Sequence, residues 1–238
     1  MDLWGRIMDG PQQGMPTNAS PLAAQRPRTV TGAATVATAL IVLACVREVL
    51  VTVGNWRIYF LVHDYLEGQA TDADVLAADS DVLAKLGSFW VSVLVGGAAG
   101  IAFLVWLWRA RINSELMSGA AAHRRARGWV VGGWTVPVAN LWIPYQVVSD
   151  IWRASAPRRS ASVTLVNAWW APFAVAAVIV RPMQWRTAEQ FDSEHDVLTN
   201  ANLSTLLTAL EVVAGLLIVL IIRRVTAWQT YRNVGNPV

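Results

Sequence analysis

Four long runs of apolar residues constrain this chain more than any other feature of its sequence. They cover residues 31–53, 86–108, 163–180 and 203–222. A helix needs about 20 apolar residues to cross a hydrocarbon core about 30 Å thick, and each run is close to that length. Only 15% of the residues are charged, whereas soluble domains have about 25%. We therefore predict an all-α, polytopic membrane protein with four transmembrane helices in one compact domain.

The charged residues between the runs predict the orientation in the membrane. Arginines cluster after the second run, whereas carboxylates dominate the segments after the first and third runs. The positive-inside rule places basic segments in the cytoplasm. We expect a multi-pass protein of the cell membrane with both termini in the cytoplasm and the two acidic loops outside. The arginine clusters are those of cytoplasmic membrane flanks facing anionic headgroups, and we predict no nucleic-acid partner.

The composition divides the chain into a membrane domain and two tails. Residues 1–29 are polar and rich in Gly, Pro and Gln, which is typical of a disordered segment. Residues 30–226 form the predicted transmembrane domain, and residues 227–238 form a short cytoplasmic tail. Alanine, leucine and valine recur at helical spacing over residues 72–86, so we expect a short external helix there.

Residues 128–152 form a fifth apolar segment that fits the charge pattern poorly as a crossing. Basic residues flank it on both sides, so a full crossing would place the second flank outside. Pro137 and Pro144 lie inside it, and each removes a helix hydrogen bond. A proline-broken, re-entrant hairpin that enters and leaves on the cytoplasmic side explains both observations. The alternative is a kinked fifth crossing.

A series of small motifs surrounds these prolines. In order they are Gly128-Trp129, Pro137, Asn140-Leu141-Trp142, Pro144 and Trp152-Arg153-Ala154-Ser155. This pattern resembles the multi-pass bacterial membrane family known as domain of unknown function 4328, which is common in actinobacteria. The similarity is strongest over residues 106–170 and extends weakly over residues 31–224. The resemblance implies a membrane location and a helical architecture, and it implies no activity.

Charged residues inside apolar runs need a physical reason, because burying a charge in lipid is costly. Glu211 lies near the middle of the last run, and Ser204, Thr208 and Gly215 share its helix face. This polar or small face should point into the helix bundle. Glu211 is either a proton-linked or ligand-binding acid, or a structural carboxyl group bonded to another helix.

The first run contains a second pair of charged residues, Arg47 and Glu48. Adjacent helical residues point about 100° apart, so they are not expected to pair well with each other. Glu48 should face the bundle. Arg47 could extend toward the headgroups, and our specific prediction for it is a structural ion pair with Glu211 on another helix.

The remaining ligand-binding candidates are polar or aromatic residues of the apolar segments. Asn140 sits between the two prolines, where it either satisfies freed backbone groups or contacts a ligand at a broken helix. The aromatic candidates could line a cavity or pack in the core. The full set of candidates is Glu48, Trp134, Asn140, Trp142, Gln146, Asn167 and Glu211. Gly96 and Gly100 should allow another helix, in this chain or in a second copy, to approach closely.

Three classes of function remain open. A small membrane assembly or regulatory component comes first, because no nucleophile motif or phosphate-binding loop occurs. The second is a ligand-handling or transport protein with a site at the broken helix. The third is a membrane-embedded enzyme that acts on a lipid or hydrophobic metabolite through a buried carboxylate. We predict no metal and no cofactor. The expected partners are the lipid bilayer, a homo-oligomer or membrane partner, and a lipid or hydrophobic ligand.

Overall fold

A computed structural model describes residues 27–79, 82–136, 138–157, 161–188 and 192–235. All regular structure in these ranges is helical, as predicted. The α-helices are α1 (Thr31–Leu66), α2 (Asp72–Asp79), α3 (Val82–Gly87), α4 (Phe89–Ser118), α5 (Trp129–Thr135), α6 (Ile143–Ser155), α7 (Thr164–Val175), α8 (Arg181–Ala188) and α9 (Glu194–Gly235). A π-helical turn, Ala176–Val180, joins α7 to α8, and two single 3₁₀ turns, Ala120–Ala122 and Ala139–Leu141, flank α5.

Four helices in the described ranges are long and apolar enough to cross a membrane. They are α1, α4, α9 and the continuous rod that α7 and α8 form over Thr164–Thr187. The prediction of an all-α protein with four such helices is confirmed. Many of their large apolar side chains are exposed, including Leu43, Leu94 and Leu216. Such exposure suits contact with lipid.

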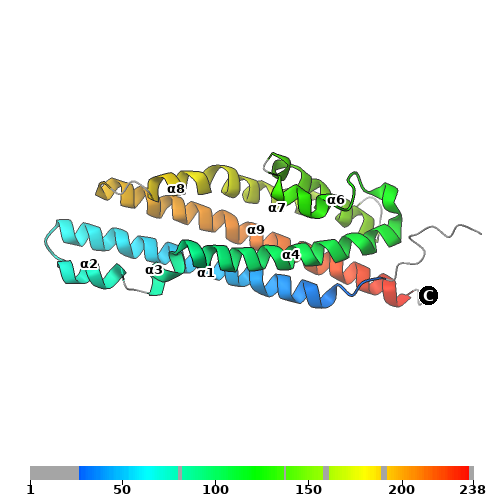
Figure 1. Ribbon diagram of the computed structural model, residues 1–238, viewed down its shortest axis with the longest axis horizontal. Coiled ribbons are helices and arrows are strands. Elements are labelled where there is room, and N and C mark those ends of the chain that lie inside the picture. The colour runs from blue at the N-terminus through cyan, green and yellow to red at the C-terminus, as the bar shows by residue number, and fades with distance from the viewer. Residues whose placement is uncertain (1–26, 80–81, 137, 158–160, 189–191, 236–238) are drawn as a thin grey trace, which may run out of the picture.

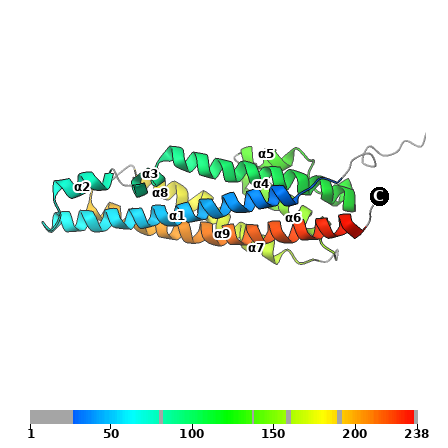
Figure 2. The ribbon, with the colours of Figure 1, turned by 90° about the horizontal axis from the view of Figure 1, so that it is seen from below.

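The four long helices run up and down along one axis (Figure 1). At one end, α4 leads into α5 and α6, and α9 finishes; we call this the basic end, after the arginines there. At the other end α1 leads into α2, and α8 leads toward the start of α9 (Figures 1 and 2). We call this the acidic end, because Asp64, Asp74 and Glu194 lie there. Both ends of the described chain lie at the basic end.

The helices follow the order α4, α1, α9, α7 around the bundle. The most extensive contacts are those of α1 with α9 and α4, and of α7 with α9. The outer helices α4 and α7 pack mainly against these partners and against α6. The short helices α5 and α6 therefore fill the space between α4 and α7 at the basic end. Trp106, Val147, Ile151 and Ile221 are fully buried there and form the centre of the core.

The fifth apolar segment is broken, as predicted. It forms α5, a 3₁₀ turn and α6, and it starts and finishes at the basic end, since α4 ends there and α7 begins there (Figure 1). It therefore returns rather than crosses. Pro144 lies in the first turn of α6, where its missing N–H group costs no helix hydrogen bond. Pro137 lies outside the described residues.

Helical structure outside the four apolar runs differs in detail from what the sequence indicated. The expected external helix is two helices, α2 and α3, and residues 80 and 81 between them are outside the described ranges. Helix α9 continues to Gly235 through the predicted C-terminal tail, and Trp228 packs against Trp152 with ring centroids 4.6 Å apart. Residues 1–26 of the predicted disordered tail are outside the described residues.

Candidate functional site

A cavity of about 400 Å³ lies inside the apolar part of the bundle. Residues of α1, α4, α5, α7, α8 and α9 line it, together with the π-helical turn. It occupies the space between α4 and α7 that α5 and α6 leave unfilled toward the acidic end. Ligand-binding pockets of small molecules have volumes of about 300–1,000 Å³. The size of this cavity falls within that range.

Aromatic rings close the cavity toward the basic end. Trp134 of α5 makes edge contacts with Phe103 of α4 and with Phe173 of α7, at centroid distances of 5.6 and 5.8 Å. Trp169 packs against Phe173 from the same helix. The indole nitrogen of Trp134 is buried and has no hydrogen-bond partner among the described residues. The tip of the hairpin thus supplies the floor of the cavity.

The cavity has an open side between α4 and α7. Gly96 and Gly100 of α4 and Ala177 of the π-helical turn line the cavity and are exposed. A Cβ atom built on either glycine would have no other atom within 4 Å. No helix of the described chain therefore packs on these two glycines, contrary to one of the expectations for them. In a bilayer, this opening would face lipid.

Three charged side chains line the end of the cavity that is nearer the acidic end: Glu48, Arg181 and Glu211. Nη2 of Arg181 donates to Oε1 of Glu211 and lies 4.0 Å from Oε1 of Glu48. The π-helical turn immediately precedes Arg181, and such turns are frequent at functional sites. Sequence analysis missed Arg181, because it directly follows an apolar run and counts as a loop residue.

Arg47 has different partners from the one predicted. Its Nη1 donates to Oε1 of Glu48 at 2.5 Å, its Nε donates to the Leu86 carbonyl at 3.0 Å, and its Nη2 donates to Ser92. The structure thus contains Arg47–Glu48 and Arg181–Glu211 pairs in place of the predicted Arg47–Glu211 pair. The argument from the 100° spacing failed because a long arginine side chain can bend back to its neighbour. Arg47 is buried rather than extended toward headgroups.

Hydroxyl groups continue the polar face beyond the charged residues. Thr52 of α1 hydrogen-bonds to both Ser204 and Thr208 of α9, with oxygen–oxygen distances of 2.8 and 2.7 Å. Asn55 donates to Ser204 at 2.8 Å. The face of α9 that carries Ser204, Thr208 and Glu211 therefore points to α1 and to the cavity. Cys45, the only cysteine, also lines the cavity, and its thiol lies 3.9 Å from the Glu211 carbonyl oxygen.

Glu48 and Arg181 lie close to one edge of the apolar layer, whereas Glu211 lies near the middle of the apolar run of α9. Glu48 and Arg181 each lie 17 residues from the basic-end start of their membrane helix, Thr31 and Thr164. At 1.5 Å per residue, this spacing corresponds to about 26 Å, against a hydrocarbon core of about 30 Å. Exposed aromatic side chains mark the same edge: Phe89, Trp90 and Trp185. Such rings are typical of the membrane interface.

The structure separates the sequence-predicted candidates into two groups. Glu48, Glu211 and Trp134 line the cavity. The other four residues are not part of its lining: Asn140, Trp142, Gln146 and Asn167. The backbone N–H of Asn140 donates to Val136, Gln146 accepts a hydrogen bond from Arg125 at 3.0 Å, and Asn167 accepts one from Tyr145 at 2.8 Å.

The arginines of the basic end form a packed network with buried carboxylates. Glu115 accepts hydrogen bonds from Arg111 and Arg127 at 2.6 and 2.5 Å. Asp150 accepts two bonds from Arg124, one from the side chain and one from the backbone, both at 2.9 Å. Arg111 is 2% exposed, so it does not face headgroups as predicted. These contacts fix the hairpin to α4 and thereby position Trp134.

His123 is buried within this network. Ser114 donates its hydroxyl hydrogen to the Arg111 carbonyl at 2.8 Å, so it accepts the hydrogen bond from Nε2 of His123 at 3.2 Å. Nδ1 of His123 is buried and has no partner among the described residues. Burial, together with the nearby positive charge of Arg111, lowers the pKa of His123 to about 4. The imidazole is therefore neutral near pH 7.

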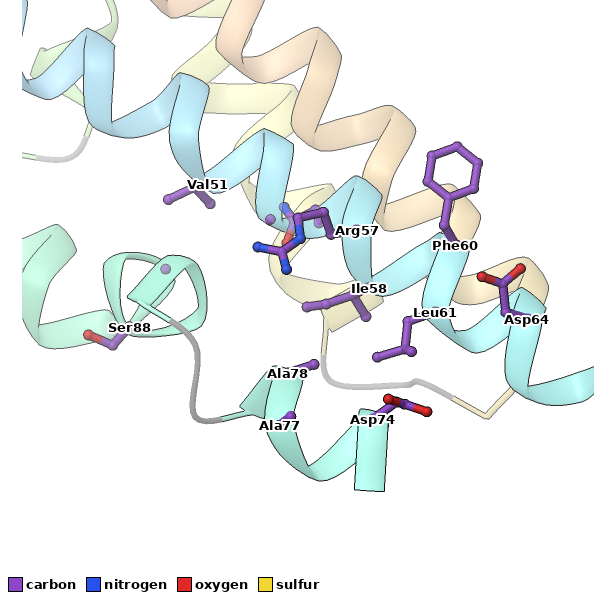
Figure 3. Close-up of a pocket in the computed structure, with 13 residues that line it drawn as sticks. Val51, Arg57, Ile58, Phe60, Leu61, Asp64, Asp74, Ala77, Ala78 and Ser88 are labelled. Atoms are coloured by element: carbon purple, nitrogen blue, oxygen red, sulfur yellow. The ribbon is translucent and has the colours of Figure 1, made fainter. Parts of the chain in front are cut away.

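A second cavity, of about 650 Å³, lies at the acidic end between α1 and the α2–α3 segment. Figure 3 shows Ile58 and Leu61 of α1 opposite Ala77 and Ala78 of α2, with Asp64 and Asp74 at one end. Hydrogen bonds from Thr71 lower the pKa of Asp74, so this carboxylate remains ionised at neutral pH.

Two residues of the neighbouring helices α1 and α9 meet at the acidic end. Nδ1 of His63 lies 2.8 Å from Oε1 of Glu194, which joins the end of α1 to the start of α9. No group of three or more potential metal ligands occurs within the described ranges.

Comparison with protein families gives a match that covers most of the chain. Residues 68–227 match the family described as "Domain of unknown function (DUF4328)". Comparisons with curated proteins and with solved structures find no match. The matched range includes α4, the hairpin, α7, α8 and most of α9, so it covers every segment that lines the cavity except α1. The chain belongs to the DUF4328 family, with the four apolar helices of a multi-pass membrane protein.

Proposed function

We propose that this protein binds an amphiphilic molecule. The molecule would enter the cavity of about 400 Å³ directly from the bilayer, through the opening between α4 and α7. The observation that carries the proposal is the combination of an opening lined by Gly96, Gly100 and Ala177 with a charged end formed by Glu48, Arg181 and Glu211. A charged side chain beside lipid costs free energy, so charged residues at such positions usually have a functional role. An apolar chain would occupy the cavity toward Trp134, and a polar head would reach the charged residues.

This proposal reverses the order of the function classes that the sequence suggested. An assembly component needs no open cavity, whereas a ligand-handling protein does. The predicted site also moves, from the broken helix itself to the cavity whose floor the hairpin forms. The hairpin contributes Trp134, and Asn140 lies outside the lining. An enzymatic role would need a reacting group, and the carboxylates of Glu48 and Glu211 already accept hydrogen bonds from arginines.

The distribution of charges supports an orientation for this proposal. By the positive-inside rule, the basic end, where both ends of the described chain lie, is expected in the cytoplasm. The charged end of the cavity then lies at the level of the outer leaflet. A bound amphiphile would have the same orientation as a lipid of that leaflet, with its head outward and its chain inward.

Native mass spectrometry of the full chain, purified in mild detergent from its host membrane, tests the proposal. We expect a defined small molecule to be retained. Gly100→Leu should abolish retention, because position 100 faces the cavity and a Cβ there clashes with nothing. Gly97→Leu is the matched control, since Gly97 is exposed on the same helix and does not line the cavity.

Two results would contradict the proposal. One is a mass spectrum without a bound molecule for the wild-type chain, for Gly100→Leu and for Gly97→Leu. The other is a dimer of the wild-type chain in which Gly96 and Gly100 are buried by a second copy, as hydrogen exchange and cross-linking would reveal. In that case the glycines would serve assembly, and the cavity would be closed by protein rather than by a ligand.

A further inference from the structure

We infer that the bound molecule is a phospholipid with a zwitterionic headgroup that carries a primary ammonium group next to its phosphate. This inference rests on the proposed function and specifies the ligand of the same site. The ammonium group would contact Glu48 and Glu211, and the phosphate would contact Arg181. The argument depends on the charge balance of the site, on its free donors and acceptors, and on its depth.

The charges in and directly behind the cavity cancel. Arg47 and Arg181 balance Glu48 and Glu211, and the two pairs are adjacent, because Nη2 of Arg181 lies 4.0 Å from Oε1 of Glu48. A headgroup with a net charge would leave one charge uncompensated in a medium of low dielectric constant, which is unfavourable. A zwitterion brings both signs and leaves the balance unchanged.

Both hydrogen-bond donors and hydrogen-bond acceptors of the site remain available for a ligand. Nε, Nη1 and Nη2 of Arg47 are all engaged, and Arg47 does not line the cavity. Among the described residues, Arg181 donates only through Nη2, and its side chain is 31% exposed. The second oxygens of Glu48 and Glu211 accept no hydrogen bond from the described residues. Arginine donors suit a phosphate, and carboxylate acceptors suit an ammonium group with three N–H donors.

The depth of the charged residues points to a lipid rather than a free solute. Glu48 and Arg181 lie about 26 Å from the basic-end starts of α1 and α7, at the level of the exposed aromatic residues Phe89, Trp90 and Trp185. If the headgroup lay at this level, the acyl chain of the same lipid would lie within the apolar layer. It would contact Ala214 and Ile218 and extend toward Trp134, and all three residues line the same cavity. The opening between α4 and α7 would allow the chain to enter without leaving the bilayer.

The test is lipid selection by the purified full chain, read by native mass spectrometry. The protein is equilibrated with equal amounts of four phospholipids that have identical acyl chains: phosphatidylethanolamine, phosphatidylcholine, phosphatidylglycerol and phosphatidic acid. We expect phosphatidylethanolamine to be retained about tenfold over either anionic lipid, which is the effect of one charge-assisted hydrogen bond. Phosphatidylcholine should be weaker as well, because its quaternary nitrogen has no N–H group to donate.

Variants separate the parts of the inference. Glu211→Gln and Arg181→Gln should each remove the preference for phosphatidylethanolamine, and Glu48→Gln serves if either protein fails to fold. Gly100→Leu should reduce retention of all four lipids. Equal retention of the four lipids by the wild-type chain, or a preference for an anionic one, overturns the inference and leaves the proposed function intact. Retention that is absent, or unchanged in Gly100→Leu, overturns the proposed function itself.

Discussion

The sulfur atom of Cys45 occupies the space that a side chain at position 215 would need. A Cβ atom added to Gly215 of α9 would stand 2.5 Å from this sulfur and 3.6 Å from a methyl carbon of Ile41 on α1. Small residues at a helix contact let two backbones approach closely. The most extensive contact of the bundle, between α1 and α9, therefore depends on a fit between one glycine and one thiol beside the charged residues.

We predict that Gly215→Ala destabilises the protein by roughly 1–3 kcal/mol, the usual cost of overpacking. Thermal unfolding in detergent, followed by circular dichroism, measures the change. Cys45→Ala in the same chain should recover most of the loss, because it removes the obstructing sulfur. Gly97→Ala is the control and should be neutral or slightly stabilising, since its new Cβ meets no other atom within 4 Å and alanine favours helix. A harmless Gly215→Ala would contradict the close fit.

Arg181 and Glu211 should behave as a coupled pair. Arg181→Met leaves the Glu211 carboxylate without the donor that it contacts, and we expect a loss of roughly 1–3 kcal/mol. Glu211→Gln should cost less, because an amide oxygen still accepts from arginine. The double variant Arg181→Met, Glu211→Leu should be more stable than Arg181→Met alone. Additive effects in this double-mutant cycle would show that the two side chains do not interact in solution.

The free energy of unfolding should decrease as the pH falls from about 6.5 to about 4, because of the titration of His123. The pKa of this group is lowered to about 4 in the folded protein from an ordinary value of about 6.5. Above about pH 6.5 the imidazole is neutral in both states and the contribution is fully present. As the pH falls toward 4, the unfolded state binds a proton that the folded state does not, so stability is lost.

We expect this loss to reach roughly 1–2 kcal/mol, after a discount for partial solvent screening. Melting temperatures at pH 7.5 and pH 5.0, compared with those of His123→Gln, measure it. Gln can still donate a hydrogen bond to Ser114 and does not titrate. An equal pH dependence in the two proteins would assign the effect to other groups.

The last turns of α9 should be required for stability, although they lie beyond the apolar run. Gln229 is fully buried; it donates to the Ala110 carbonyl at 2.9 Å and to Ser155 at 2.8 Å, and it accepts from Asn113 at 3.3 Å. Gln229→Leu removes these three hydrogen bonds from a fully buried position, and we expect a cost of roughly 1–3 kcal/mol. Gln229→Glu tests the donor role separately.

A truncation provides a second test of the same region. A chain that stops before Trp228 should unfold at a lower temperature than the full chain, since it loses both Gln229 and the contact between Trp228 and Trp152. A chain that stops after Gly235 should match the full chain. Equal melting temperatures for all three would mean that the end of α9 contributes little.

The sequence was sufficient for the four membrane helices, and it favoured a returning hairpin over a kinked fifth crossing, because these depend on local composition and on charge. An apolar run of about twenty residues has the length of a helix that crosses a bilayer. Basic flanks on both sides of residues 128–152 argue against a crossing by that segment. The family resemblance carried by the motifs around Pro144 and Trp152 supported a membrane location and a helical architecture. Glu48, Glu211 and Trp134 were found because a charge or a large ring in an apolar run is conspicuous.

The pairing of the charges could not be predicted in the same way. The partner of Glu211 depends on the rotation of α8, which the π-helical turn Ala176–Val180 sets. The partner of Arg47 depends on the fold of its own flexible side chain and on the Leu86 carbonyl, a backbone group that has no signature in the sequence. Gly96 and Gly100 were expected at a helix contact, because the sequence does not show that α4 lies at the open side of the bundle.

The π-helical turn before Arg181 has a consequence for how such a site can arise or disappear. An i→i+5 turn holds one residue more than an α-helical turn, so deleting one of residues 176–180 would restore the α-helical repeat. Because that shorter turn completes the same rotation, every later residue of the rod would keep its direction, and Arg181 would still point to Glu211. The same deletion within the α-helical part of α7 would instead rotate every later residue by about 100° around the axis, and it would disconnect the charged pair while leaving both charged residues in the chain.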